Sequence, residues 1–347
     1  MPEAEPHILF EKRGALGLVT LNRPRALNAL THGMCIGLAR KLAEWAADPA
    51  IGAVVIRGAG PRAFCAGGDI RALMESASGG TRYAASFFWD EYRLNAAIAA
   101  YPKPYIALLH GIVMGGGVGV SAHGRYRLAD ASLVWAMPET GIGLVTDIGA
   151  SHFLSRMPDE MGLYLALTGA RIGQGDAMAL GLVTHCVAAS DHEALLEKLA
   201  AGEDVMRVVD TFATRPGLAP LAAERKRIAA IFSASSIEAI FERLERDGSE
   251  FATATAQTLR AMSPSALKFT FRALREGRAL SLHECLRQEY RIALRAIPAH
   301  DFQEGVRAAL IDKNAKPVWN PPSLAALSDA DIARYFAGLG AGELSFA

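Results

Sequence analysis

The chain has 347 residues, of which 51% are hydrophobic and 21% are charged, a composition typical of a large globular protein with a sizeable core. Lys plus Arg and Asp plus Glu balance at 36 each, so no basic excess indicates a nucleic-acid or membrane partner. No segment reaches the roughly 20 apolar residues of a membrane helix. Residues 1–10 lack the apolar core of a signal peptide. Four cysteines without CxxC or zinc spacing favour reduced thiols, no metal site and a cytoplasmic protein.

The first half of the chain alternates strands, turns and helices. Residues 16–21 and 53–57 are predicted strands, because they are short apolar or β-branched runs bounded by turn residues. Apolar residues spaced by three and four over 27–45 predict an amphipathic helix between them. A second helix, rich in aromatic residues, is predicted over 81–100, and an apolar run at 105–109 predicts a further strand. This alternation is typical of an α/β fold.

Two glycine-rich turns follow strands of this half. They are Gly67-Gly68 and Gly115-Gly116-Gly117, and each leads into a predicted helix. Glycine allows a backbone to approach a ligand closely, and the first amide N–H groups of a helix point outward without partners. Two such turns would place two N–H donors at one point, as an oxyanion requires. The alternative is that both are ordinary turns packed in an α/β fold.

Three acids are candidates for chemistry. Glu139 follows Pro138 in a turn, Asp147 lies before a glycine, and Glu91 sits inside the aromatic helix. Each also has a structural alternative, as a solvated turn acid, a helix cap or a surface acid respectively. No GxSxG motif and no Ser-His-Asp pattern is present in the sequence, so a serine hydrolase is not indicated.

After Ala189 strand signals disappear and helix-forming residues dominate. Residues 228–259 predict two or more helices, and Ser263-Pro264 is a good helix start, with serine as the cap and proline in the first turn. Further helices are predicted over 266–275, 282–296 and 329–338. The end of the chain, 338–347, is predicted to be loose.

Three motifs in this order resemble the crotonase (enoyl-CoA hydratase/isomerase) superfamily: Asn22 to Leu30, Phe64 to Asp69, and the glycine triplet. Within it the chain is most similar to the 3-hydroxyisobutyryl-CoA hydrolases, through Gly67 to Arg71, the helix containing Glu91, His110 to Gly119 and Ala136 to Leu144. The resemblance implies an α/β crotonase (ClpP-like) spiral of ββα units. It also implies three segments: a core with the CoA-thioester site at 1–190, a helical insertion at 191–262 and C-terminal helices packing on the core at 263–347.

The resemblance also implies roles for individual residues. Gly68 and Gly116 would donate the oxyanion N–H pair, and Glu139 and Asp147 would be catalytic. Glu91 would bind the substrate together with Gly116, Glu139 and Asp147. The CoA moiety would be bound by residues within or directly after the first two motifs and by one later lysine: Arg25, Ala66, Asp69, Ile70 and Lys268. CoA is part of the substrate, so no separate cofactor is implied.

One departure from the family pattern bears on the reaction. Gly119 stands where a hydratase has the first of two glutamates. Smaller departures are Val145-Thr146, where Phe-Pro is expected, and Ala150, where glycine is expected.

These features favour hydrolysis of a short branched acyl-CoA thioester, 3-hydroxyisobutyryl-CoA in valine catabolism. Glu139 would act as a general base on water or would attack the thioester to form a mixed anhydride. The alternatives are an enoyl-CoA hydratase or Δ3,Δ2-enoyl-CoA isomerase of the same fold, and a non-catalytic CoA-binding protein. Plain members of the superfamily form trimers or pairs of trimers, so a homo-oligomer is expected. The added helices favour a smaller assembly as the alternative.

Overall fold

The computed structural model describes residues 6–79, 82–312 and 315–346. Residues 1–5 of the N-terminal segment, Thr81 at the predicted helix start and Ala347 lie outside the described part. The chain forms two compact units that alternate along the sequence. The first unit comprises Met1–Asp69, Arg93–Trp135 and Arg171–Pro220, and the second comprises Ile70–Tyr92, Ala136–Ala170 and Leu221–Ala347. Each unit therefore draws on more than one of the three predicted sequence segments.

The first unit is built on a seven-stranded sheet with the strand order β1-β2-β3-β5-β7-β9-β10. The edge strands β1 and β10 run antiparallel to their neighbours, and the inner pairs are parallel. The strands of this sheet are β1 (Ile8–Arg13), β2 (Leu16–Leu21), β3 (Ala53–Gly58), β5 (Tyr105–Leu109), β7 (Tyr126–Ala129), β9 (His185–Val187) and β10 (Ala213–Thr214). The predicted strands at 16–21, 53–57 and 105–109 are thus confirmed.

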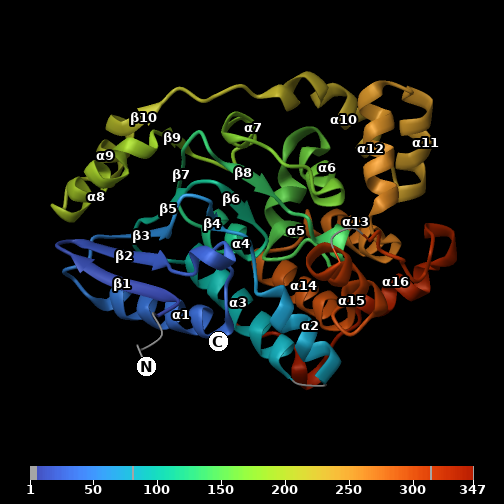
Figure 1. The fold of residues 1–347 in the computed structure, drawn as a ribbon, viewed down its shortest axis with the longest axis horizontal. Helices are drawn as coiled ribbons and strands as arrows, with labels where there is room; N and C mark the ends of the chain where they lie inside the picture. Colours follow the sequence, from blue (N-terminus) through green and yellow to red (C-terminus); the bar gives the residue numbers. More distant parts are fainter. Residues whose placement is uncertain (1–5, 80–81, 313–314, 347) are drawn as a thin grey trace. The chain divides into compact units, whose positions relative to one another are not determined.

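Helices cover both faces of this sheet (Figure 1). Leu16 and Leu18 of β2 pack with Leu195 and other apolar residues of helices α8 (His192–Ala200) and α9 (Val205–Phe212). Gly17 points to the opposite face, because side chains alternate along a strand. A Cβ on Gly17 would lie 2.6 Å from the ring of Trp45 on helix α1, so glycine is required for this close approach. The helices of this unit are α1 (His32–Ala47), the last part of α3 (Tyr83–Ala99), α4 (Gly116–Ala122), α7 (Gln174–Ala179), α8 (His192–Ala200) and α9 (Val205–Phe212).

Helix α1 begins later than the sequence predicted. A 3-10 turn at Pro24–Ala26 is followed by Leu27 and Asn28 in the left-handed region, with φ of 52° and 57°. These conformations interrupt the predicted helix at 27–45, so α1 starts only after Thr31, whose side chain accepts the N–H of Met34. Local periodicity does not reveal this break, because the residues on both sides keep helical spacing.

A second, three-stranded sheet has the order β4-β6-β8 and positions the glycine turns. Its strands are β4 (Ala63–Cys65), β6 (Ile112–Met114) and β8 (Val134–Ala136). Strands β4 and β6 are parallel, so their carboxyl ends lie at the same edge of the sheet. The turn that follows each strand therefore emerges beside the other.

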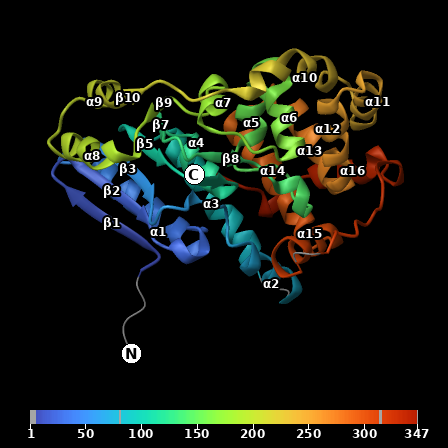
Figure 2. The same cartoon turned by 45° about the horizontal axis from the view of Figure 1, so that its top comes forward.

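The second unit is helical and is organised around helix α13, which contacts α5, α6, α14 and α16. Its helices are α2 (Ile70–Gly79), the first part of α3 (Tyr83–Ala99), α5 (Ala150–Phe153), α6 (Met161–Thr168), α10 (Arg225–Phe232), α11 (Ile237–Asp247), α12 (Glu250–Ala261), α13 (Pro264–Gly277), α14 (Leu282–Ala296), α15 (His300–Val306) and α16 (Asp329–Phe336). Helices α11 and α12 lie side by side (Figure 2). The predicted helices in 228–259 and the Ser263 cap are confirmed.

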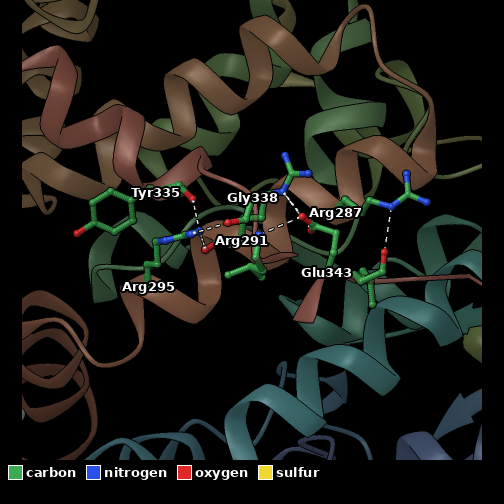
Figure 3. Close-up of polar contacts among 8 residues, drawn as sticks. Arg287, Arg291, Arg295, Tyr335, Gly338 and Glu343 are labelled. Carbon is green, nitrogen blue, oxygen red and sulfur yellow. Dashed lines mark hydrogen bonds and ion pairs between the residues drawn. The ribbon is translucent and has the colours of Figure 1, made fainter. Parts of the chain in front are cut away.

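The predicted loose C-terminal end is wrong, because three arginines on one face of α14 hold it (Figure 3). Arg287 donates to the carbonyl oxygen of Leu344 at 2.9 Å, and Arg291 pairs with the Glu343 carboxylate at 2.9 Å. Arg295 donates to the carbonyl oxygens of Tyr335 and Gly338 at 3.1 and 3.4 Å. The arginines are four residues apart, so they share one helix face. Leu344 is 1% exposed, so the segment is anchored by burial as well as by hydrogen bonds.

Within the described part of the chain, no helix combines the length and the apolar character that crossing a bilayer requires.

Candidate active site

The two glycine turns meet in the first unit. Gly67 has a φ of +112°, and a Cβ built on it would lie 3.5 Å from the carbonyl oxygen of Met114 and 3.7 Å from the amide nitrogen of Gly116. The first turn is held from the other side, because Ala66 donates to Leu27 and Leu30 donates to Gly67 through their backbone groups. The parallel pairing of β4 and β6 explains the meeting, since both turns leave the same sheet edge.

Two amide N–H groups in these turns are available to a ligand. Among the residues that the structure describes, no acceptor binds the N–H of Gly68 or of Gly116. Gly116 is the first residue of α4, where helix geometry leaves N–H groups without partners. Gly116 is buried, whereas Gly68 is partly buried. Buried backbone donors are almost always paired in proteins, so the unpaired donor at Gly116, next to the turn of Gly68, is consistent with a site for a polarised carbonyl oxygen.

The predicted CoA contacts in the first unit have different surroundings. Arg25 is exposed, and its guanidinium has no partner among the described residues. The amides of Ala66 and Asp69 already donate to the carbonyl oxygens of Leu27 and Leu30, so these two N–H groups do not bind a ligand. The Asp69 carboxylate pairs with Arg23 at 3.0 Å. Arg25 is therefore the cation of this group that is free to bind a phosphate.

Ile70 and Lys268 belong to the second unit. Ile70 is the first residue of α2. The Lys268 ammonium pairs with Glu238 at 2.9 Å and donates to the carbonyl oxygen of Leu327 at 3.0 Å. These contacts neutralise and position the ammonium within the unit, so its surroundings give the predicted phosphate role no support.

The three candidate acids are buried in the second unit. Glu91 on α3 is 2% exposed, Glu139 is 5% exposed and Asp147 is 4% exposed. Glu139 opens a short 3-10 turn, Glu139–Ile142, that ends at Gly143 in the left-handed conformation. A Cβ on Gly143 would lie 2.5 Å from the backbone of Asp301, so this turn is packed tightly against α15. Burial excludes the solvated-turn alternative for Glu139 and the surface alternative for Glu91, and the helix-cap alternative for Asp147 is excluded because the N-cap of α5 is Gly149.

The acids differ in how easily they ionise. Burial, and then the negative charges of its acidic neighbours, raises the pKa of Glu91 well above its usual range. Burial and the charge of Asp147 do the same to the pKa of Glu139. Burial raises the pKa of Asp147 only to about 6, because the Tyr92 hydroxyl donates to its Oδ2 at 2.6 Å and favours the carboxylate. Asp147 is therefore the first of the three to ionise.

Glu91 and Glu139 each keep an oxygen without a partner. Glu91 Oε1 and Glu139 Oε2 are buried and accept or donate no hydrogen bond within the described residues. Buried polar atoms are normally satisfied. Unpaired carboxyl oxygens beside a carboxylate are consistent with a place where a ligand supplies the missing contacts.

A fourth buried acid, Glu289 of α14, was not singled out in the sequence. It is fully buried, and its carboxylate accepts the N–H groups of Gly149 and Ser151 and the hydroxyl of Ser151. The one signal available in the sequence is its position on the apolar face of α14, four residues after Cys285 and three before Ile292. An acid on such a face requires a specific polar partner, and that partner lies 140 residues away in the chain.

The departures from the family pattern are also resolved. Gly119 is buried in α4, so no carboxylate stands at that position. Val145 and Thr146 are fully buried, and the Thr146 hydroxyl donates to the carbonyl oxygen of Ala166 at 3.2 Å. Ala150 is buried as the first residue of α5. These substitutions are thus accommodated by packing and internal hydrogen bonds.

The raised pKa of Glu289 predicts a loss of stability that begins above about pH 4.5 and is complete only above 8. Burial raises this pKa to about 8, and the nearby charge of Asp147 also raises it. The folded protein therefore keeps a proton that the unfolded chain has lost, and the free energy of unfolding falls as pH rises toward and through 8. Between pH 7 and 9 we expect a loss of roughly 1 kcal/mol from this group. The other titrating groups are the same in both proteins, so thermal melts across this window should show a smaller decline in Glu289→Gln. An equal decline in both proteins would contradict the expectation.

The adjoining turns after parallel strands, with free amide donors, define a protein of the crotonase fold class. A model of the enoyl-CoA hydratase/isomerase family matches residues 16–336, and the chain belongs to this family. It is 47% identical over 346 residues to the mitochondrial 3-hydroxyisobutyryl-CoA hydrolase of Xenopus tropicalis, covering 97% of this chain and 90% of that protein.

Two solved structures agree with this assignment of the fold. A carnitinyl-CoA dehydratase from Mycobacterium thermoresistibile has a TM-score of 0.94 at 40% identity and covers 99% of both chains. An enoyl-CoA hydratase from Rhodobacter sphaeroides has a TM-score of 0.90 at 38% identity, covering 98% of this chain and 100% of that one. The predicted crotonase fold and superfamily are confirmed.

Proposed function

We propose that the chain hydrolyses a short branched acyl-CoA thioester, with 3-hydroxyisobutyryl-CoA as the substrate and 3-hydroxyisobutyrate and CoA as products. The observation that carries the proposal is the buried acid cluster of Glu91, Glu139 and Asp147 combined with Gly119, which stands in place of the first hydratase glutamate. The similarity to a 3-hydroxyisobutyryl-CoA hydrolase over nearly the whole chain supports the same reaction.

The first unit supplies the electrostatic part of the chemistry. The free N–H groups of Gly68 and Gly116 would bind the thioester oxygen and stabilise the negative charge that develops on it. One such donor contributes roughly 3–4 kcal/mol of barrier lowering. Arg25 would bind a CoA phosphate, and the backbone at Ala66, Asp69 and Ile70 would meet the adenine. Lys268 remains a weaker proposal for a phosphate contact, because Glu238 already pairs with it.

The second unit supplies the acids. Glu139 would either remove a proton from water or attack the thioester carbon, in which case CoA leaves and water then cleaves the anhydride. Asp147, the first acid to ionise, would accept the substrate 3-hydroxyl or orient Glu139, and Glu91 would bind the substrate. No further cofactor or metal takes part in this scheme, since the thioester is already electrophilic and CoA belongs to the substrate.

A thiol-release assay over a panel of acyl-CoA thioesters tests the proposal. The expected result is fastest release from 3-hydroxyisobutyryl-CoA, slower release from isobutyryl-CoA and no loss of enoyl absorbance with crotonyl-CoA. Water addition to crotonyl-CoA without thiol release would favour the hydratase alternative, which the dehydratase and hydratase names of the two solved structures keep open. Turnover of a 3-enoyl-CoA to its 2-enoyl isomer would favour the isomerase. CoA binding without any turnover would favour a non-catalytic protein.

Three further proposals accompany the reaction. A place in valine catabolism fits the proposed substrate, and disruption of the gene should cause 3-hydroxyisobutyryl-CoA to accumulate in cells that are supplied with valine.

A cytoplasmic location fits four cysteines that are all buried free thiols, whereas the Xenopus relative is named as mitochondrial. Fractionation of the source cells distinguishes the two locations. A homo-oligomer is proposed from the family, and light scattering measures its size.

A further inference from the structure

We infer that helix α14 selects for the substrate 3-hydroxyl group, because Glu289 and Tyr290 hold the Asp147 carboxylate in place from two directions. Both are positioning residues, and all of the residues concerned belong to the second unit. The inference rests on the proposed function, since it assigns the hydroxyl of that substrate to Asp147.

The first direction is through the backbone that follows Asp147. Glu289 Oε2 accepts the N–H of Gly149 at 2.6 Å, and Oε1 accepts the N–H of Ser151 at 2.9 Å and its hydroxyl at 2.5 Å. These three donors lie two to four residues beyond Asp147, at the start of α5. The Glu289 carboxylate therefore hydrogen-bonds to both Gly149 and Ser151 and connects this short turn to α14.

Helix α13 closes the turn from another side. A Cβ on Gly277 would lie 2.2 Å from the carbonyl oxygen of Ser151, so the helix backbone and the turn are in direct contact. Helices α13 and α14 both pack on α5. The turn therefore has little freedom to shift while Glu289 keeps its hydrogen bonds.

The second direction is through the carboxylate of Asp147. The Tyr92 hydroxyl donates to its Oδ2 at 2.6 Å. The ring of Tyr290 packs edge-on against Tyr92, with ring centroids 6.2 Å apart, and against Trp89 at 5.9 Å. Tyr290 directly follows Glu289, so one helix turn supports both the backbone and the carboxylate of Asp147.

This support matches what hydroxyl recognition requires. Tyr92 donates to Oδ2, the backbone amide of Asp147 also favours the carboxylate, and we assign the substrate hydroxyl to Oδ1. A buried acceptor that a substrate hydroxyl satisfies rejects an analogue lacking that hydroxyl, because the acceptor would remain unpaired. Such selection needs a fixed acceptor. Among the described residues, Glu289 has no cationic partner, and burying an acid in this way lowers stability. Its contacts all serve the turn that carries Asp147.

Substituting Glu289 with glutamine tests the inference. The amide keeps the size of the side chain but leaves only one oxygen, so either Gly149 or Ser151 loses its acceptor. For 3-hydroxyisobutyryl-CoA we expect kcat/KM to fall by roughly 10²-fold, the loss typical of a small misplacement of a reacting or binding group. For isobutyryl-CoA, which lacks the hydroxyl, we expect little change. The matched control is Glu343→Gln in the C-terminal segment, which removes a partly exposed ion pair with Arg291 of α14 and should leave both rates unchanged.

A double-mutant cycle separates positioning from general damage. Asp147→Asn alone should lose most of the selectivity, and adding Glu289→Gln should then cost little more, because the second change acts only through Asp147. The inference is overturned if the losses of kcat/KM in Asp147→Asn and Glu289→Gln multiply in the double variant. It is also overturned if Glu289→Gln loses equally with both substrates. If Glu289→Gln does not fold, as shown by circular dichroism, Tyr92→Phe provides the test. It removes one hydroxyl and should show the same selective, non-additive loss.

The assay also distinguishes failure of the inference from failure of the proposed function. Wild-type protein that does not prefer the hydroxylated thioester contradicts the substrate assignment. In that case the double-mutant cycle of Glu289→Gln and Asp147→Asn is measured with the acyl-CoA that the protein does turn over. If the two losses of kcat/KM multiply in the double variant, the inference about Glu289 is refuted.

Discussion

Replacing Glu139 with glutamine is expected to lower kcat for thioester hydrolysis by roughly 10³-fold, the scale of a lost general acid–base group. Glutamine has nearly the same volume, and Glu139 Oε2 has no hydrogen-bond partner within the described residues. The change therefore breaks no internal hydrogen bond of that oxygen and should leave folding intact. KM should change little, because the loss concerns the chemical step rather than ground-state binding. Steady-state thiol release measures both constants.

The pH dependence of kcat provides the companion observation. A base must be deprotonated to act, and burial with the charge of Asp147 raises the pKa of Glu139 well above its usual range. The wild-type rate should therefore rise with pH through the neutral range, and the residual rate of Glu139→Gln should not follow this rise. A residual kcat above about a tenth of the wild-type value would show that Glu139 has no part in the mechanism. Loss of a general acid–base group lowers the rate by more than about tenfold.

Isotope labelling distinguishes the two roles open to Glu139. Repeated turnover in ¹⁸O-labelled water should leave the label in the Glu139 carboxylate if an anhydride forms and its enzyme carbonyl is the one that water attacks. A general base never exchanges its own oxygens, so mass spectrometry of the peptide containing Glu139 would find no label in that case.

Replacing Gly117 with alanine is expected to separate the two glycine turns and to lower kcat by roughly 10²–10³-fold, as for loss of an oxyanion donor. A Cβ at this position would lie 2.3 Å from the carbonyl oxygen of Cys65 and 2.9 Å from its carbonyl carbon. These are backbone atoms at the end of β4, three residues before Gly68, so relief of the clash must move one turn away from the other. Overpacking of this kind also costs about 1–3 kcal/mol of stability, which a thermal melt measures.

The matched control is the same substitution at Gly37 inside α1. A Cβ there would meet its nearest neighbours at 3.9 Å, an ordinary contact, and the residue lies in a regular helix. Gly37→Ala should be neutral or stabilise the protein by about 0.5–1 kcal/mol, because alanine favours a helix. Activity in Gly117→Ala close to that of Gly37→Ala would show that the amides at the turns do not act on the substrate oxygen.

The two turns illustrate what can be predicted from local sequence. Strand, glycine turn and helix follow one another within about ten residues, and the rules for such units depend on neighbouring residues alone. The start of α13 at Ser263-Pro264 is predictable for the same reason, since a cap and its helix lie within one turn. The placement of both turns at one sheet edge also follows once their strands are taken to be parallel.

The surroundings of Asp147 could not be predicted in this way. Tyr92 is 55 residues away from Asp147 in the chain, and Glu289 is 140 residues away from Gly149. No periodicity or motif spacing links such distant residues, and the sequence marks Glu289 only as an acid on an apolar helix face. Packing of α14 against α5 creates the contact, and the burial that results sets the pKa of each acid.

The same distinction applies at the chain end and at Lys268. A glycine-containing terminus is normally loose, and the family resemblance implies a phosphate contact for Lys268. In the structure the chain end is anchored by contacts with residues that are remote in sequence, Arg287, Arg291 and Arg295. The Lys268 ammonium is already paired with Glu238. Local sequence therefore specifies the fold class, the oxyanion turns and the candidate acids. Long-range packing specifies which charges are paired, which acids ionise and what holds them in place, because burial and partner distance depend on residues that meet only in the folded chain.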